Sequence, residues 1–235
     1  MYLDPFHASQ GSTITITPEQ GSQFAKQISD DFNPLHNPDS KRFCVPGDLL
    51  FALVLARYGL AKNMAFKYTG MVGKGVVLNF PETQASEFCI ADTNEKPYLE
   101  VSRDGDISHN MTLIEAFSRA YVAFSGHSFP HILVPLMQQE NVMINPDKPM
   151  VIYESMAFNF ENLSAERPSL ELTNSSLNVS GKRGLVRMEF DICESGQRVG
   201  SGYKTMVLSG LREFDQAQLD NLIQLYEQTK SNYRI

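Results

Sequence analysis

The sequence predicts an α+β fold built from two similar units in tandem. Each unit is a helical segment followed by four antiparallel strands, and two observations indicate this order. The run Leu49–Ala56 is wholly apolar, as expected of a helix that is buried on every side. After this run, and again in the second half, four strand-like segments are separated by turn-forming Gly, Pro, Asn and Asp residues. We therefore expect a sheet that wraps around an apolar helix twice in one chain.

The first half opens with a short strand and an amphipathic helix. We expect the strand at residues 13–16 and the helix from Pro18, with three apolar side chains spaced by four on one face: Phe24, Ile28 and Phe32. Four strands are predicted further along this half, at residues 65–69, 76–80, 87–91 and 98–102.

The segment 45–63 is predicted to form the buried helix of the first half. Pro46 suits the first turn of a helix, and the negative charge of Asp48 suits the positive end of the helix dipole. Between Leu49 and Leu60 only Arg57 is charged, and the run is too short to span a bilayer. We therefore expect a core helix and no membrane segment.

The second half repeats this order. A helix is predicted at 112–124, and the segment 129–139 matches the pattern of 45–55, with Pro130 in the place of Pro46. Four strands follow, at residues 150–160, 169–179, 184–193 and 198–208. The two units together are a double hotdog, a single-chain pseudo-dimer with two sheets.

A last amphipathic helix is predicted from Asp215, with Gln218 as its capping-box partner. Its buried stripe consists of Leu219, Leu222, Ile223 and Tyr226. The polar segment 94–111 is the best boundary between the units, which we place at 1–104 and 105–235.

Composition and charge exclude several classes of partner. The 235 residues carry a net charge of −7 without a cluster of lysine or arginine, so we expect neither nucleic acid nor a membrane as a partner. The first residues lack a basic or apolar leader, which favours a cytoplasmic protein. The cysteines are odd in number and scattered, as in reduced thiols, and predict no metal or cofactor: Cys44, Cys89 and Cys193.

The stretch DDFNPLHNPD, residues 30–39, is the strongest candidate in the sequence for a catalytic segment. One interpretation is a surface loop in which Asn and Asp side chains form Asx-turns and cap the next helix. The other is a site in which an acid and an imidazole are held beside the buried helix. Residues before Pro34 and Pro38 are biased to extended conformations, so the loop is stiff in either case.

Residues 31–36, Asp-Phe-Asn-Pro-Leu-His, resemble the Asp-x-Asn-Pro-x-His signature of the MaoC-like hotdog hydratases, which hydrate enoyl thioesters to (R)-3-hydroxyacyl thioesters. The likeness extends weakly to Asp39 and to Pro46-Gly47, and its specific part covers roughly 20 residues. The first half also looks like bacterial proteins without an assigned function. The resemblance implies a substrate on CoA or on acyl carrier protein.

The resemblance also implies roles for four residues. Asp31 and His36 would hold and activate a water molecule, since an imidazole can take its proton and a carboxylate can orient it. Asn33 would fix the loop. The N–H of Gly47, at the positive end of the buried helix, would polarise the thioester carbonyl, a contribution typically worth about 3 kcal/mol.

Three features depart from the family pattern: Asp30, the interval before Gly47, and the place of the motif in the first half, since fused hydratases commonly carry it in the later half. Asp30 replaces the usual glycine, and its charge either raises the pKa of Asp31 or faces solvent. The interval from His36 to Gly47 is short, which could shift the acid and base relative to the helix. The matching segment of the second half, SGHSFPH at 125–131, has histidines but no acid, so we expect one site per chain at most.

Other functions are also open. Asp48 could be the catalytic acid of a hotdog thioesterase, although dipole compensation in the first helical turn is the simpler interpretation. The chain could also bind acyl thioesters without turning them over, as a regulatory module. His127 and His131 are expected to cap or to form buried hydrogen bonds. Because the fused fold already imitates a dimer, the chain could be a monomer or a homodimer.

Overall fold

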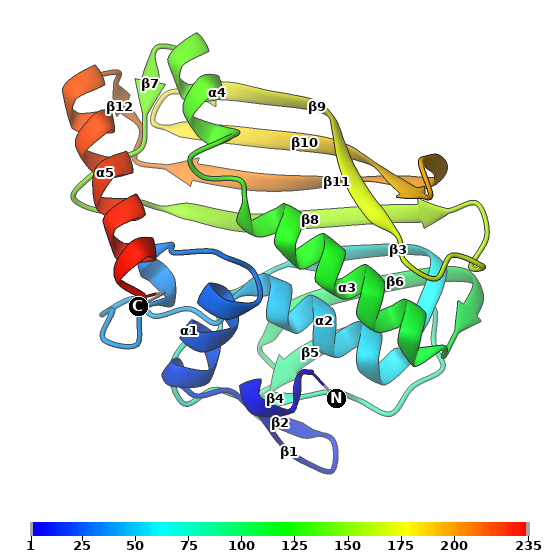
Figure 1. Ribbon diagram of the computed structural model, residues 1–235. Helices are drawn as coiled ribbons and strands as arrows, with labels where there is room; N and C mark the ends of the chain where they lie inside the picture. Colours follow the sequence, from blue (N-terminus) through cyan, green and yellow to red (C-terminus); the bar gives the residue numbers. More distant parts are fainter. Residues whose placement is uncertain (1, 234–235) are drawn as a thin grey trace.

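The computed structural model describes residues 2–233 and contains one antiparallel sheet of ten strands, with the helices packed on one face (Figure 1). The strand order is β1-β2-β4-β5-β6-β3-β8-β11-β10-β9. The strands of this sheet are β1 (Ala8–Gln10), β2 (Thr13–Thr15), β3 (Leu60–Tyr68), β4 (Val77–Asn79), β5 (Glu87–Asp92), β6 (Pro97–Ser108), β8 (Val151–Phe160), β9 (Ser169–Ser180), β10 (Arg183–Glu194) and β11 (Gln197–Ser209).

The remaining elements are the helices and a small second sheet. The helices are η1 (Asp4–Phe6), α1 (Pro18–Gln27), η2 (Pro34–His36), α2 (Gly47–Tyr58), α3 (Met111–Gly126), α4 (Leu133–Gln139) and α5 (Gln216–Tyr233). The second sheet pairs β7 (Val142–Met143) with β12 (Arg212–Glu213).

The two halves have the same strand order, so the double hotdog prediction is confirmed. In the first half β3 follows α2 and is bordered by β6, β5 and β4; in the second half β8 follows α4 and is bordered by β11, β10 and β9. The two predicted sheets are joined edge to edge, because β3 pairs with β8 from Asn63↔Asn159 to Lys67↔Ser155. One continuous sheet therefore spans both halves.

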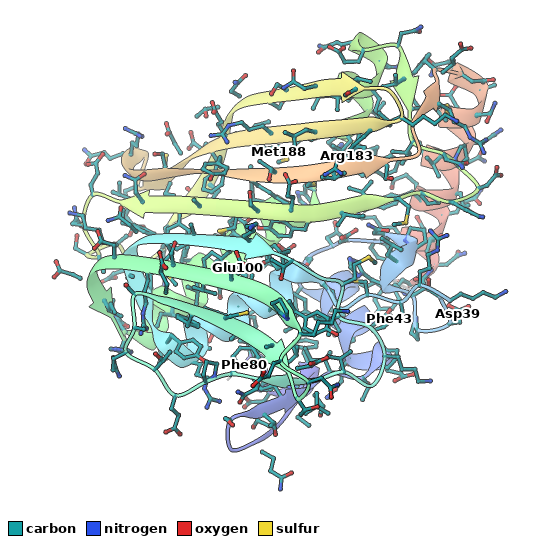
Figure 2. The ribbon with its side chains drawn as sticks, turned by 180° about the vertical axis from the view of Figure 1, so that it is seen from behind. Asp39, Phe43, Phe80, Glu100, Arg183 and Met188 are labelled. Carbon is teal, nitrogen blue, oxygen red and sulfur yellow. The ribbon has the colours of Figure 1, made fainter. Side chains whose placement is uncertain are left out.

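Helices α2 and α3 lie side by side against the sheet (Figure 1). Phe51 of α2 is fully buried, with its ring centroid 5.2 Å from that of Phe66 on β3 and 4.7 Å from that of Tyr121 on α3. Helix α2 can be apolar all round because the sheet covers one side and the other helices cover the rest. The face of the sheet seen in Figure 2 bears polar side chains such as Glu100, which pairs with Lys67 at 3.2 Å.

Several predicted boundaries move. Helix α1 ends before Phe32, which lies in the loop. Helix α2 ends at Tyr58, because the next residue, Gly59, has a φ of +85° that suits glycine. The predicted helical segment 45–63 therefore gives its last residues to β3. The unit boundary expected at 104/105 falls within β6, which continues to Ser108 because it stays paired with β3 up to Leu60↔Ser108.

The segment 129–139 is a weaker counterpart of α2 than its pattern predicts. Only the seven residues of α4 are helical. The chain turns between α3 and α4, where the Ser128 carbonyl accepts the N–H groups of both Ile132 and Leu133. Pro130, which has no N–H, lies in this turn. As a result α3, rather than α4, packs beside α2.

The final helix, α5, stands at one end of the sheet and reaches the loop that precedes α2 (Figure 1). Asp215 Oδ1 accepts the backbone N–H of Gln218, as predicted for a capping residue, but the Gln218 side chain donates to Asp215 Oδ2 instead of accepting the Asp215 N–H as in a capping box. Of the predicted stripe, Leu219 and Tyr226 are buried and the other two residues are half-buried. The Tyr226 ring meets that of Phe32 edge to face, with centroids 6.0 Å apart.

We expect Phe51→Ala to lower the free energy of unfolding by about 3–5 kcal/mol, because it leaves a cavity where α2, α3 and β3 meet. Chemical denaturation followed by circular dichroism measures the change. Leu172→Ala, at a side chain on β9 that is 42% exposed, is the control and should stay within about 0.5 kcal/mol of wild type. Equal effects of the two substitutions would contradict the wrapped-helix description.

Candidate active site

A cavity of about 590 Å³ lies where the start of α2, the end of α3, strands β8 and β11, and helix α5 meet. The loop at residues 31–37 and the turn at 44–46 form one wall. The cavity takes side chains from both halves of the chain. Its apolar lining includes Leu50, Val72, Phe129, Leu133, Ile144, Met206 and Leu222.

Two consecutive Asx-turns give the loop its shape. The Asn33 N–H donates to Asp31 Oδ1 at 2.8 Å, and the Leu35 N–H donates to Asn33 Oδ1 at 3.1 Å. Pro34 then opens the short helix η2, which ends at His36. The Asx-turn interpretation is therefore correct for the backbone, and these turns also bring the acid and the imidazole to the same side of the loop.

The structure brings Asp31 and His36 together at the cavity wall. Asp31 Oδ2 lies 3.5 Å from His36 Nε2, and the two side chains are 27% and 12% exposed. His36 Nδ1 lies 2.7 Å from the Cys44 carbonyl oxygen, which can only accept a hydrogen bond. Nδ1 therefore carries the proton, and the lone pair of neutral His36 is on Nε2, facing the carboxylate.

The hydrogen bond between His36 and the Cys44 carbonyl also brings the short segment before Gly47 close to the loop. The Cys44 N–H donates to the Leu35 carbonyl at 2.9 Å, while the Cys44 carbonyl accepts from His36, so the chain folds back onto the loop. Gly47 follows three residues after Cys44 and lines the same cavity as His36. The shortened interval thus does not separate the imidazole from the start of α2.

The electrostatics of Asp31 and His36 are coupled. Burial raises the pKa of Asp31, but the hydrogen bond and charge of His36, the Asn33 N–H and the charge of Lys204 together lower it below its usual value. Burial lowers the pKa of His36, but the hydrogen bond and charge of Asp31, the hydrogen bond to the Cys44 carbonyl and the charge of Asp48 together raise it above 6.5. His36 is therefore a stronger base than a free imidazole.

Asp30 is largely buried and is paired with side chains of α5 and of the end of α3. Its Oδ2 lies 2.5 Å from Lys230 Nζ on α5 and 3.4 Å from His127 Nε2, and its side chain is 20% exposed. The Asp30 side chain therefore does not simply point to solvent, and the pKa of Asp31 is lowered rather than raised. The backbone of Asp30 has a φ of +53°, so it takes the left-handed conformation that the glycine of the family pattern would adopt readily.

Gly47 lies at the first position of α2, in close contact with two tyrosine rings. A Cβ atom at this position would lie 2.9 Å from Tyr153 Cδ1 and 3.0 Å from Tyr68 Cε1, so only glycine fits without movement. Tyr68 donates its hydroxyl to the Gly47 carbonyl at 2.9 Å. Within residues 2–233 the Gly47 N–H has no acceptor, as expected at the start of a helix.

A second polar cluster, formed by Asp48, Ser125 and Lys204, lines the same cavity. All three residues are buried, and the Ser125 hydroxyl donates to Asp48 Oδ2 at 2.6 Å and accepts from Lys204 Nζ. Asp48 is thus more than a dipole-compensating charge at the helix start. Burial raises the pKa of Asp48 and lowers that of Lys204, and the attraction between the two opposes both shifts.

No pattern in the sequence indicates Ser125 or Lys204 as members of a site. Ser125 belongs to the SGHSFPH segment, but its histidines are not the residues that reach the cavity: His127 pairs with Asp30, and His131 is exposed. Burial raises the pKa of the Cys44 thiol to about 12, so Cys44 is protonated near neutral pH. Across residues 2–233 no three His, Cys, Asp or Glu side chains gather as metal ligands would.

We expect Asp31→Asn to lower the pKa of His36, because it removes the charge that stabilises the imidazolium and leaves the burial that opposes it. NMR titration of the imidazole measures the change. In the wild-type protein the pKa of His36 should lie above 6.5, and in Asp31→Asn it should be lower than in wild type. Asp104→Asn, at an exposed carboxylate of β6, should leave the His36 titration unchanged. An identical His36 pKa in Asp31→Asn and wild type would show that the two side chains are not coupled.

Helices in the described part of the chain are all too short or too polar to cross a membrane.

Comparison with solved structures finds the TesB protein of Mycobacterium avium subspecies paratuberculosis, with a TM-score of 0.48 and 9% identity over 88% of this chain and 97% of that one. A hot dog fold protein of unknown function from Alicyclobacillus acidocaldarius has a TM-score of 0.47 and 9% identity, over 89% and 98% of the two chains.

The peroxisomal multifunctional enzyme type 2 of Drosophila melanogaster has a TM-score of 0.45 and 11% identity over 83% of this chain. The match covers 47% of that enzyme, so this chain spans about half its length. A search of curated protein sequences finds no match. The model of one protein family, described as Protein of unknown function (DUF3581), matches residues 1–217, and the chain therefore belongs to this family.

Proposed function

We propose that the protein catalyses reversible hydration of a 2-enoyl thioester to a 3-hydroxyacyl thioester, as MaoC-like hydratases do. One observation carries the proposal: Asp31 Oδ2 and His36 Nε2 lie 3.5 Å apart on the wall of one cavity. A water molecule can lie at about 2.8 Å from both atoms and donate one hydrogen to each. The closeness of these two residues of the Asp-x-Asn-Pro-x-His pattern supports a role in activating water.

In the proposed reaction the water oxygen bonds to C3 of the enoyl group while His36 Nε2 takes its proton. The electrons of the C2=C3 bond move toward the thioester carbonyl and form an enolate. The proton on His36 is then delivered to C2, and the enolate returns to a thioester. Asp31 orients the water and balances the charge of the transient imidazolium. Water is added and nothing else is consumed.

The start of α2 is suited to stabilise the enolate oxygen. The Gly47 N–H has no acceptor among the described residues, lies at the positive end of the helix dipole and belongs to a residue that lines the cavity. Such a donor is worth about 3 kcal/mol where negative charge develops. The mostly apolar walls suit an acyl chain, and the cavity volume of about 590 Å³ is that of a small-molecule site. CoA and acyl carrier protein are the proposed carriers.

We expect His36→Ala to lower kcat/KM for hydration of crotonyl-CoA by about 10²- to 10⁴-fold, the usual contribution of a general base. Loss of absorbance of the conjugated thioester measures the rate, and longer 2-enoyl-CoA substrates extend the assay. His131→Ala changes an exposed histidine and should keep the wild-type rate. A His36→Ala variant with an unchanged melting temperature and an unchanged rate would refute the proposal.

The second candidate is thioester hydrolysis by Asp48. It is favoured by the position of this carboxylate at the start of α2, on the cavity wall and with Oδ1 unpaired among the described atoms.

Hydrolysis releases a free thiol, whereas hydration does not. We expect no thiol release from acyl-CoA in a thiol-reagent assay. Release that is lost in Asp48→Asn and kept in Asp31→Asn would favour the thioesterase. Ligand-induced thermal stabilisation with neither reaction would favour a non-catalytic binder.

A further inference from the structure

In the proposed hydration step the cluster of Asp48, Ser125 and Lys204 neither takes nor delivers a proton, although its charges act on Asp31 and His36. The cluster is built from three separate elements. Asp48 comes from α2, Ser125 from the end of α3 and Lys204 from β11. The residues are 6%, 3% and 4% exposed, and all of them line the cavity. The Ser125 hydroxyl lies between the two charges, since it donates to Asp48 Oδ2 at 2.6 Å and accepts from Lys204 Nζ.

The cluster has hydrogen-bonding capacity that the protein leaves unused. Asp48 Oδ1 is buried and has no hydrogen-bond partner within residues 2–233. Of the three N–H groups of the Lys204 ammonium, one donates to Ser125, and the ammonium lies 4.2 Å from the centroid of the Tyr153 ring. No other acceptor for Lys204 is present among these residues. Asp48 Oδ1 therefore has unused capacity as an acceptor and Lys204 Nζ as a donor, in two residues that line the same cavity.

Fold stability does not account for such an arrangement. A buried ion pair is often no more stable than apolar residues of the same size, and an unpaired buried oxygen is a further cost. Leu50, Leu133 and Met206 line the same cavity, so apolar side chains at the three cluster positions would match much of its lining. Buried polar groups with free capacity on a cavity wall are typical of a binding site.

We propose that Asp48, Ser125 and Lys204 form a subsite for a neutral polar group of the ligand that offers both a hydrogen-bond donor and an acceptor. The donor would meet Asp48 Oδ1 and the acceptor Lys204 Nζ. A carboxylate would face the charge of Asp48 and an amine the charge of Lys204, so a hydroxyl or an amide fits best. The inference rests on the acyl-thioester ligand of the proposed function. The polar group is then a hydroxyl on the acyl chain or an amide of the pantetheine arm.

The test measures binding in a His36→Ala background, where the proposed reaction cannot consume the ligands. Isothermal titration calorimetry gives the Kd of CoA, butyryl-CoA and its 2-, 3- and 4-hydroxy derivatives. Asp48→Asn and Lys204→Met are each added to this background. The matched controls are Asp104→Asn and Lys67→Met, at exposed residues on β6 and β3. Ser125→Ala removes only the bridging hydroxyl. It is used in place of Asp48→Asn or Lys204→Met if either of these variants does not fold.

For an acyl hydroxyl, at least one hydroxybutyryl-CoA should bind about tenfold or more tightly than butyryl-CoA, and the cluster variants should remove this preference. For a pantetheine amide, the cluster variants should weaken CoA and every acyl-CoA to the same extent. Either result supports the subsite. Unchanged affinities in the cluster variants, or no binding of any ligand by the parent, would overturn it. These outcomes do not depend on whether His36→Ala abolishes hydration, so the two proposals can fail separately.

Discussion

The pairing of β3 with β8 is the contact on which the rest of the molecule depends. It joins the two halves into one sheet from Asn63↔Asn159 to Lys67↔Ser155, and this sheet covers α2 and α3 together. The cavity lies between the halves: Asp31 and His36 enter it from the first, and Lys204 enters it from the second. Neither half could form this cavity alone. A single chain therefore provides an arrangement that two separate hotdog units would have to form by association.

Most of the fold could be predicted because it depends on periodic signals. Strands such as β10 alternate in polarity along their length, and an apolar run as long as that of α2 is typical of a core helix. The errors lie where tertiary contacts override local pattern. Gly59 ends α2 within a run that still looks helical, and β6 continues past a polar stretch because β3 remains beside it. The turn between α3 and α4 likewise depends on hydrogen bonds to the Ser128 carbonyl.

The candidate site could be predicted only in part. The loop of Asp31 and His36 is contiguous in sequence, and its Asx-turns follow from local residue types. Lys204 is different, because a lysine in a strand is usually exposed and nothing near it in sequence indicates burial. Its partners Asp48 and Ser125 are 156 and 79 positions away. Such a cluster is defined by topology, and the sequence alone could not reveal it.

Helix α5 has a consequence for work with shortened forms of the protein. The family match ends at residue 217, while the helix continues to Tyr233. A form of the protein that stops at residue 217 would lack Tyr226, whose hydroxyl bonds to the backbone on either side of Asp31. It would also lack Lys230, which pairs with Asp30. Leu222 would also disappear from the cavity wall. A recombinant fragment that ends at residue 217 would therefore be a poor substitute for the 235-residue chain, since the loop of Asp31 and His36 would lose its contacts with α5 and the cavity would lose part of its wall.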